Sequence, residues 1–365
     1  MGTIRRPGRI AVQGRSTVPH LDRAGRPPKD EPMSIEADRV ADAPSDNWVY
    51  RALPVRFWGY AQLARWDRPI GWWLLLWPCW WSLALATNTA VHGPVWTPVG
   101  GGPKGDAAST LVLLPIPLFL FWLGAVAMRG AGCTYNDIID ARIDAQVERT
   151  ASRPIPAGRV SKGEAKVFMF AQVAVGFLVL VALCLLRPPF NAFALLLAVG
   201  SLAIVAAYPF AKRVTDWPQL VLGLAFSWGA LMGWAVVFGE LSEAAFMLYL
   251  GAIAWTVGYD TIYAHQDKED DALVGVRSTA RLFAERTKEA LVVFYAIALG
   301  LFALAAAVSG GSWPSFLGLL AGGLHMTWQI SSLDIDDGAQ CLRLFRSNTT
   351  FGWLAFAGFA FDVVV

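Results

Sequence analysis

The sequence predicts an all-α protein that crosses a membrane about nine times. Three observations support this fold class: 55% of the 365 residues are hydrophobic, only 16% are charged, and the mean hydropathy is +0.45. Soluble domains carry about 25% charged residues. Apolar runs of about 20 residues, the length of a membrane-spanning helix, recur along the chain, and the alternating pattern of a membrane β-barrel is not seen.

Nine candidate spans follow one another along the chain. Their approximate bounds are 69–87, 111–130, 165–186, 190–209, 218–238, 243–263, 289–308, 314–332 and 349–364. The clearest break lies between the seventh and eighth spans, where residues 309–314 read Ser-Gly-Gly-Ser-Trp-Pro. Gly and Pro in this arrangement are typical of a turn.

Basic residues segregate between alternate loops. If the N-terminal tail lies inside, one face collects nearly all the loop arginines and lysines, and the other face has only Lys104 and Arg187. The positive-inside rule makes the basic face cytoplasmic. One span added or lost in the middle would destroy this segregation, so it supports the span count.

The first 48 residues differ from the rest of the chain. They are rich in Arg, Gly, Pro and Asp, so we expect a disordered tail before a single transmembrane domain over residues 49–365. Residues 1–21 contain four arginines and no acid, which is weakly typical of a transit peptide, but Gly and Pro interrupt the helix that such a peptide needs. The preferred hypothesis is that the native chain starts at Met33, without residues 1–32, and N-terminal sequencing of the native protein tests it.

Cysteines and tryptophans have structural interpretations. The four cysteines lack metal-binding spacing and lie in or near apolar segments, so we expect small core residues. They are Cys79, Cys133, Cys184 and Cys341. Six tryptophans crowd the first span, which exceeds the needs of an interfacial belt. They are Trp66, Trp72, Trp73, Trp77, Trp80 and Trp81. A belt combined with helix packing is the preferred interpretation, and an aromatic wall along a tunnel is the alternative.

A first acidic cluster follows the second span. Asp137, Asp140 and Asp144 have spacings of three and four, so they share one helix face and repel one another. A cation removes that repulsion, and oxygen ligands favour Mg²⁺, to which Asn136 can add a neutral oxygen. The alternative is a solvated acidic helix end that pairs with nearby arginines.

A second acidic cluster ends the sixth span on the same predicted face. Asp260, Asp267 and Asp271 again share one helix face. A carboxylate deep in a bilayer costs roughly 2.5–3.5 kcal/mol on insertion scales, so Asp260 is a functional candidate by default. His265 is a possible proton carrier, although we expect a surface residue. Two clusters on one face are typical of a pair of Mg²⁺ ions that hold a diphosphate.

Basic residues border the same face. Arginine pairs bidentately with phosphate, and lysine acts as a point charge. Basic residues in cytoplasmic loops are also expected from the positive-inside rule alone. The two interpretations, phosphate binding and membrane topology, are equally favoured for Arg68, Arg153 and Lys212. Topology is preferred for Arg149 and Arg213.

Taken together, these motifs resemble the 4-hydroxybenzoate polyprenyltransferase family, within the UbiA-type intramembrane prenyltransferases. Residues 136–144 match the family's NDxxDxxxD motif, and residues 260–271 match DxxYAxxDxxxD. Further similarities cover residues 68–78, 149–158, 208–213 and 275–280. The Tyr-Ala pair in the second motif separates this pattern from menaquinone-type and haem-type relatives.

The resemblance implies nine helices around a central cavity, capped by two Asp-rich cytoplasmic loops. It implies one Mg²⁺ at Asp137, Asp140 and Asp144 and another at Asp260, Asp267 and Asp271. The expected catalytic residues are Asp260, Lys212 and Arg153. The expected substrate-binding residues are Asn136, Arg68, Arg129, Arg213 and Tyr263.

The implied reaction is Mg²⁺-dependent transfer of a polyprenyl group from its diphosphate to the ring of 4-hydroxybenzoate, in ubiquinone biosynthesis. The alternatives are another aromatic acceptor (homogentisate, a naphthoate or a porphyrin) or a cation-coupled transporter. Transporters place acids near the midplane, so acids at one interface favour the enzyme. The expected surroundings are the bilayer of a bacterial inner membrane, or alternatively of the mitochondrial inner membrane, with no nucleic-acid partner and an oligomeric state that the sequence does not reveal.

Overall fold

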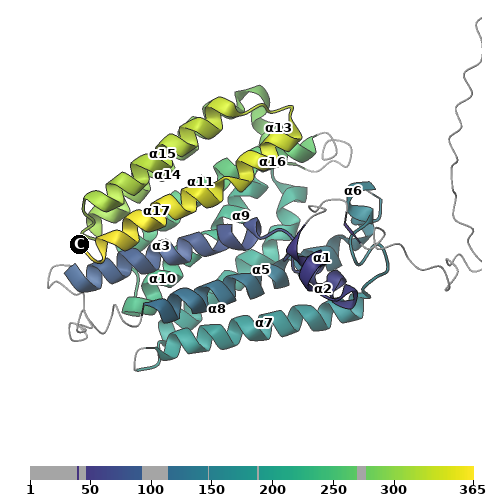
Figure 1. Ribbon diagram of the computed structural model, residues 1–365, viewed down its shortest axis with the longest axis horizontal. Helices are drawn as coiled ribbons and strands as arrows, with labels where there is room; N and C mark the ends of the chain where they lie inside the picture. Colours follow the sequence, from purple (N-terminus) through teal and green to yellow (C-terminus); the bar gives the residue numbers. More distant parts are fainter. Residues whose placement is uncertain (1–38, 41–46, 93–113, 147, 187–188, 269–276) are drawn as a thin grey trace, which may run out of the picture. The chain divides into compact units, whose positions relative to one another are not determined.

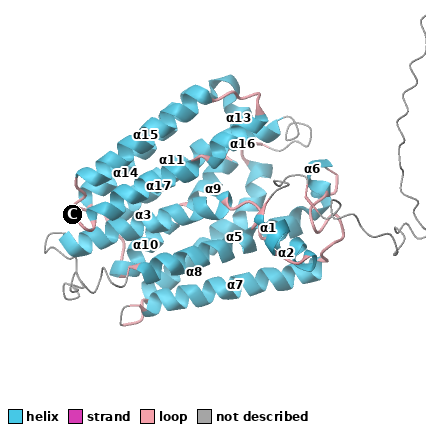
Figure 2. Ribbon diagram, in the orientation of Figure 1, coloured by secondary structure: helices cyan, strands magenta, loops and turns pink. Residues whose placement is uncertain are grey.

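Figure 1 shows a computed structural model of the protein, which describes residues 39–40, 47–92, 114–146, 148–186, 189–268 and 277–365. Over these residues every regular element is a helix (Figure 2), which confirms the all-α fold class. The described helices lie in one compact unit, Val40–Val365. The predicted tail falls almost entirely outside the described residues, as does the hypothesis about Met33.

Ten long helical segments build this unit. They are α3 (Ile70–His92), α5 (Pro115–Asp144), α7 (Lys162–Leu185), α8 (Ala192–Val214), α9 (Pro218–Phe226), α10 (Gly229–Phe238), α11 (Glu243–Ala264), α14 (Thr287–Val308), α15 (Trp313–Ser332) and α17 (Asn348–Asp362). Shorter helices connect them. These are α1 (Trp48–Ala52), η2 (Val55–Phe57), α2 (Trp58–Leu63), α6 (Glu148–Ala151), η3 (His265–Asp267), α13 (Thr279–Phe283), η4 (Ala284–Arg286) and α16 (Gly338–Arg346).

Seven segments of the described chain are long and apolar enough to cross a membrane, and they coincide with the first seven predicted spans. The eighth and ninth predicted spans form α15 and α17, which pack against each other, and α17 also packs against α3. Neither is among the seven, and α17 has only 15 residues, ~22 Å, less than the ~30 Å hydrocarbon core. The membrane fold is therefore confirmed, but the count of nine spans is not.

The fifth predicted span, 218–238, is divided into α9 and α10 at Ser227 and Trp228. Glycines let α10 approach α3 closely: a Cβ on Gly233 would lie 2.6 Å from the carbonyl oxygen of Cys79. Hydropathy alone does not reveal this break, because both halves are apolar.

Burial separates central from peripheral helices. In α11, 78% of the most apolar window is buried, against 11% in α8. Large apolar side chains on α7 and α8, such as Val167, Leu178 and Leu196, are 65–72% exposed. Such exposure of large apolar groups is typical of a lipid-facing surface. The layer of α7 and α8 therefore faces lipid, and α11 lies in the interior of the bundle.

The tryptophan-rich run mainly joins α3 to its neighbours. Trp77 and Trp81 are fully buried, and the Trp81 indole N–H donates to the Gly352 carbonyl of α17 at 3.1 Å. Trp73 stacks on Trp77 with ring centroids 5.0 Å apart. These contacts confirm the packing interpretation for this part of the run. All four cysteines are buried and none of them forms a disulfide, as expected for core residues.

Gly352 sits where a Cβ would overlap the Trp77 indole. We expect Gly352→Ala to separate α17 from α3 and to lower the free energy of unfolding by about 1–3 kcal/mol. The matched control is Gly300→Ala on α14, where a Cβ meets nothing within 4 Å. Thermal unfolding of the two variants in detergent checks this, and equal melting temperatures would contradict it.

Candidate functional site

Three aspartates, here called the α5 carboxylates, occupy the last two turns of α5. Asp137, Asp140 and Asp144 are only 1%, 7% and 7% exposed. The helix continues 14 residues beyond the predicted end of its span and so carries all three on one buried face. The predicted shared face is confirmed. Of the alternative, the solvated helix end is wrong because the three side chains are buried, whereas pairing with nearby arginines is observed.

Asp137 is held by an arginine that the sequence analysis did not select. The Arg65 guanidinium donates to both carboxylate oxygens, at 3.0 Å from Nη1 and 2.7 Å from Nη2. Both side chains are buried, at 11% and 2% exposed. The sequence offered one signal for Arg65, its position three residues before Arg68 and just ahead of the first span. Its partner, Asp137, lies 72 residues away in the sequence, so local spacing does not reveal the pair.

Arg153 reaches the same carboxylates from the loop after α6. Its Nη1 lies 3.1 Å from Asp144 Oδ2 and 3.6 Å from Asp137 Oδ1. Thr150 supports the loop by donating from Oγ1 to the Asp144 carbonyl at 2.9 Å. The loop is seated by a small apolar cluster, comprising Leu63, Ala141, Ile155, Val160 and Ala165. The structure thus brings the predicted Arg153 to the predicted aspartates.

The second cluster is described only in part. Asp260 is half-buried, one turn before the end of α11. Asp267 belongs to η3, but its side chain lies outside the described residues, as does Asp271 altogether. Figure 1 shows that α5 and α11 both end at the side of the bundle where α6 and α16 lie.

His265 is not the surface residue that we expected. It is 4% exposed, and its Nε2 lies 2.9 Å from Thr287 Oγ1. Burial, reinforced by the nearby Lys268 ammonium, lowers the imidazole pKa to about 4. The ring is therefore neutral near pH 7, and Lys268 itself pairs with Asp336 at 3.1 Å.

An apolar cavity of about 300 Å³ runs along α5 and reaches Asn136, the residue before Asp137. Residues of α3, α5, α7, α8, α9 and α10 line it. Along α5 the lining extends from Phe121 to Asn136, which is ~22 Å at 1.5 Å per residue. Phe226 and Trp228 add aromatic surface, whereas none of the six clustered tryptophans of α3 and the preceding turn lines the cavity. An elongated apolar molecule fits such a space.

Arg129 is the charged residue among the cavity's lining residues. Its guanidinium carbon lies 5.2 Å from the centroid of the Phe226 ring, and its Nε is buried without a hydrogen-bond partner among the described residues. Gly71 of α3 makes room for it, because a Cβ there would lie 2.5 Å from Nε. A buried N–H donor without a partner is costly, so a ligand that accepts its hydrogen bond is favoured.

Tyr208 is a site residue that the sequence analysis quoted only within a motif. It lines the cavity from α8, and Asp260 and Tyr263 of α11 and Arg129 of α5 lie in its neighbourhood. Three helices that are distant in sequence therefore converge at this end of the cavity. Asn136 also lines this end, as the sequence analysis expected of a substrate-binding residue.

Other predicted residues are placed differently. The Arg68 guanidinium donates to its neighbour Asp67 at 3.1–3.2 Å, and the Tyr263 ring packs on Phe345 of α16 with centroids 4.6 Å apart. Lys212 and Arg213 lie in the last turn of α8, but their side chains are outside the described residues.

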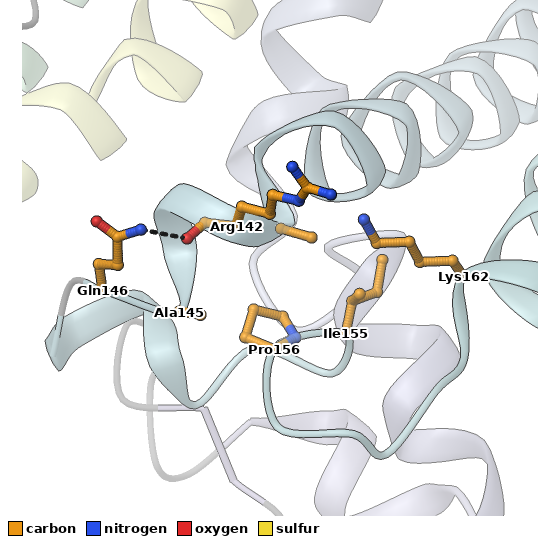
Figure 3. A pocket seen from close by; sticks show the side chains of 7 residues that line it. Arg142, Ala145, Gln146, Ile155, Pro156 and Lys162 are labelled. Atoms are coloured by element: carbon orange, nitrogen blue, oxygen red, sulfur yellow. Dashed lines mark hydrogen bonds between the residues drawn. The ribbon is translucent and has the colours of Figure 1, made fainter.

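A second hollow of about 470 Å³ lies on the outer side of the end of α5 (Figure 3). Arg142 and Lys162 point over it, and Ile155 and Pro156 lie beneath them. None of the α5 carboxylates lines it. Its lining is short and carries two basic side chains, whereas the cavity has an extended apolar lining.

The donor set of the α5 carboxylates fits a hard divalent cation. Asp140 and Asp144 offer carboxylate oxygens at a helix C-terminus, where the backbone dipoles also favour positive charge. In the described part of the chain, no group of three His, Cys, Asp or Glu residues is already arranged as a metal site. A cation bound here would have to displace the Arg153 guanidinium from the carboxylates, or bind to the carboxylates together with it.

Relatives of known name share much of this sequence. A protein from Arabidopsis thaliana, "4-hydroxybenzoate polyprenyltransferase, mitochondrial", is 40% identical over 92% of this chain and 75% of its own length. A Bos taurus protein of the same name is 42% identical over 92% of this chain and 81% of its own length.

Solved structures share the fold. A UbiA homolog from Aeropyrum pernix K1 superposes with a TM-score of 0.60 at 24% identity, over 80% of this chain and 97% of that one. A UbiA homolog from Archaeoglobus fulgidus bound to GPP and Mg²⁺ gives 0.57 at 19% identity, over 84% and 99%. The model of the UbiA prenyltransferase family matches residues 75–357, which include the α5 carboxylates, the cavity and Asp260. This chain belongs to the UbiA prenyltransferase family.

Proposed function

We propose that this protein transfers a polyprenyl group from polyprenyl diphosphate to the ring of 4-hydroxybenzoate, ortho to the hydroxyl, with release of diphosphate, in ubiquinone biosynthesis. The observation that carries the proposal is an apolar cavity lined by the half-buried Arg129, which extends along α5 as far as Asn136, the residue before the buried Asp137. The names of the 40–42% identical relatives support this acceptor over homogentisate, naphthoate or porphyrin.

Different parts of the site bind the two substrates. The apolar cavity accommodates the prenyl tail, and Arg129 binds the carboxylate of the acceptor in the same space. The diphosphate lies at the acidic end, where Arg153 is available to pair with it, and Lys212 and Arg213 at the end of α8 are proposed to contribute further positive charge. Asn136 and Tyr208 line the boundary between the two regions.

Mg²⁺ is the proposed cofactor. Asp137, Asp140 and Asp144 would hold one ion, and Asp260, Asp267 and Asp271 another. When bound, Mg²⁺ supplies positive charge that neutralises the diphosphate leaving group. The binding of GPP and Mg²⁺ by the Archaeoglobus homolog supports a metal-dependent family.

The chain's own side chains then control the allylic fragment. Breaking the C–O bond leaves an allylic cation and diphosphate, and the ring carbon ortho to the hydroxyl donates the electron pair that forms the new C–C bond. The apolar lining of the cavity disfavours water that would capture the cation, and desolvated aromatic faces such as Phe226 and Trp228 stabilise the cation by roughly 2 kcal/mol. The ring proton leaves last, and we propose Asp260 or the released diphosphate as its acceptor.

The protein lies in a membrane, and the bacterial inner membrane, with the acidic end in the cytoplasm, is the location that we propose from the sequence. The relatives from Arabidopsis and Bos taurus are named mitochondrial, which supports the mitochondrial inner membrane instead. Membrane fractionation of the native source distinguishes the two locations.

Membranes that contain the protein, supplied with labelled 4-hydroxybenzoate and a long prenyl diphosphate, should form an apolar labelled product with Mg²⁺ and none with EDTA. Membranes with Asp144→Asn provide the matched control. Diphosphate release with a different aromatic acceptor only would move the protein to a sister activity. No Mg²⁺-dependent chemistry with any acceptor would revive the transporter alternative.

Arg129→Met keeps the volume of the side chain but removes its charge. We expect the KM for 4-hydroxybenzoate to rise about 30-fold or more, corresponding to about 2 kcal/mol, with little change in the KM for the prenyl diphosphate. Arg142→Met on the same helix is the control, because Arg142 lies at the outer hollow. Steady-state kinetics with each substrate varied in turn measures the effect, and equal changes in both KM values would argue against carboxylate binding by Arg129.

Asp260→Asn retains the shape of the side chain but cannot take a proton. We expect turnover to fall by about 100-fold or more if Asp260 acts as base or ligand. Binding of prenyl diphosphate, measured alongside, separates the two roles. A variant that binds diphosphate normally and keeps full turnover would remove Asp260 from the chemistry.

A further inference from the structure

The hollow at the outer side of the end of α5, here called the outer hollow, has a basic rim and an apolar floor (Figure 3). Arg142 approaches it from α5, and Lys162, the first residue of α7, approaches it from the other side. Ile155, only 9% exposed, and Pro156 form the floor. Its volume of about 470 Å³ is typical of small-molecule sites, which span about 300–1,000 Å³.

The positive charge at this rim is not balanced by nearby acids. Within the described part of the chain, neither Arg142 nor Lys162 pairs with a carboxylate, and no acidic residue is among those that line the hollow. Glu164 is close in sequence, but it lies two residues from Lys162, on another side of α7, and it accepts from the Ser161 N–H at 2.9 Å. Both cations are exposed, so an anion can reach them.

The outer hollow lies where α5 and α7 meet the membrane boundary. Lys162 begins one membrane-crossing segment, Lys162–Leu185, and α5 ends another at Asp144. Val167 and Phe170, five and eight residues after Lys162, are 72% and 64% exposed, as expected of contact with lipid tails. Phe170 lies ~12 Å beyond Lys162 along the helix. The basic rim is therefore at the level of lipid headgroups, and apolar surface follows at the depth of the acyl chains.

We propose that the outer hollow binds an anionic phospholipid, with the headgroup phosphate between Arg142 and Lys162 and the acyl chains along the exposed face of α7. Arginine pairs bidentately with phosphate, and lysine acts as a point charge. Basic pockets between membrane helices bind anionic headgroups in this way. A zwitterionic headgroup carries the same phosphate together with a cation, which the two basic side chains repel.

This site is separate from the one in which the reaction is proposed to occur. No described residue lines both the outer hollow and the apolar cavity. Lys166, one turn after Lys162 and also exposed, adds a third positive charge on the same face of α7. A lipid held here bridges α5 and α7, so its binding should also raise the melting temperature of the protein.

The competing account is that these basic residues serve membrane topology alone. Any exposed basic pair at the start of a membrane helix would then attract anionic lipid equally. Arg286 and Lys288 provide the matched comparison, because both are exposed, they lie at the start of α14, and neither lines the outer hollow. Replacing either pair by methionine removes the same charge.

The test titrates the full-length protein in detergent with phosphatidylglycerol or phosphatidylcholine and follows bound lipid by native mass spectrometry. We expect phosphatidylglycerol to bind more tightly than phosphatidylcholine, and high salt to weaken it. Arg142→Met/Lys162→Met should lower the affinity for phosphatidylglycerol about tenfold or more, and Arg286→Met/Lys288→Met less than about threefold. The exchange Arg142→Lys/Lys162→Arg keeps both charges and should bind within about threefold of the parent.

Three outcomes would overturn the proposal. Equal affinity for phosphatidylcholine would remove the preference for anionic lipid, and an equal loss in Arg286→Met/Lys288→Met would leave only general surface charge. Displacement of phosphatidylglycerol by inorganic phosphate at similar concentration would make the outer hollow a site for free anions. If the double methionine variant does not fold, Lys162→Gln is measured alone, with an expected loss of about threefold or more.

Discussion

The site depends on the electrostatic cost of placing three carboxylates at the end of α5. Each is nearly buried, they share one face, and they lie at the helix C-terminus, where the backbone dipoles disfavour negative charge. Arg65 and Arg153 offset this cost from two different segments. Because these contacts need α2 and the loop after α6 in place, the fold of both segments is tied to the charge on α5. The charge of the acidic motif therefore constrains the positions of α2 and of the loop after α6.

A second constraint is the separation of charge from apolar surface. The α3 tryptophans fill the contact with α17 and α11, and a cavity lies between α3, α5, α7, α8, α9 and α10. The lining of that cavity is apolar apart from Arg129, Tyr135, Asn136, Ser201 and Tyr208. A reactive cation formed at such a boundary has apolar and aromatic surface on one side and the departing diphosphate on the other. An allylic cation, which water would capture, can persist only where apolar surface is separated from the charged groups in this way.

Much of the fold was predictable because hydropathy and helical periodicity are local properties. The long helices fall close to their predicted spans, and the spacing of Asp137, Asp140 and Asp144 correctly places them together. The pairing of Arg65 with Asp137 was not predictable, because it joins residues far apart in the chain and depends on a left-handed backbone. The break between α9 and α10 and the burial of His265 likewise arise from tertiary packing, which composition does not encode.

The position of Arg129 on α5 links acceptor binding to the reaction. Arg129 precedes Asn136 by seven residues, two helical turns, so both face the cavity ~10.5 Å apart along one helix. In the proposed reaction, an acceptor whose carboxylate binds Arg129 and whose ring extends along α5 toward Asn136 presents the opposite part of its ring to the diphosphate end. The hydroxyl of 4-hydroxybenzoate lies opposite its carboxylate, so the ring carbons next to that hydroxyl face the allylic cation. In the proposed reaction, the spacing of two residues on a rigid helix therefore selects both the acceptor and the carbon that reacts.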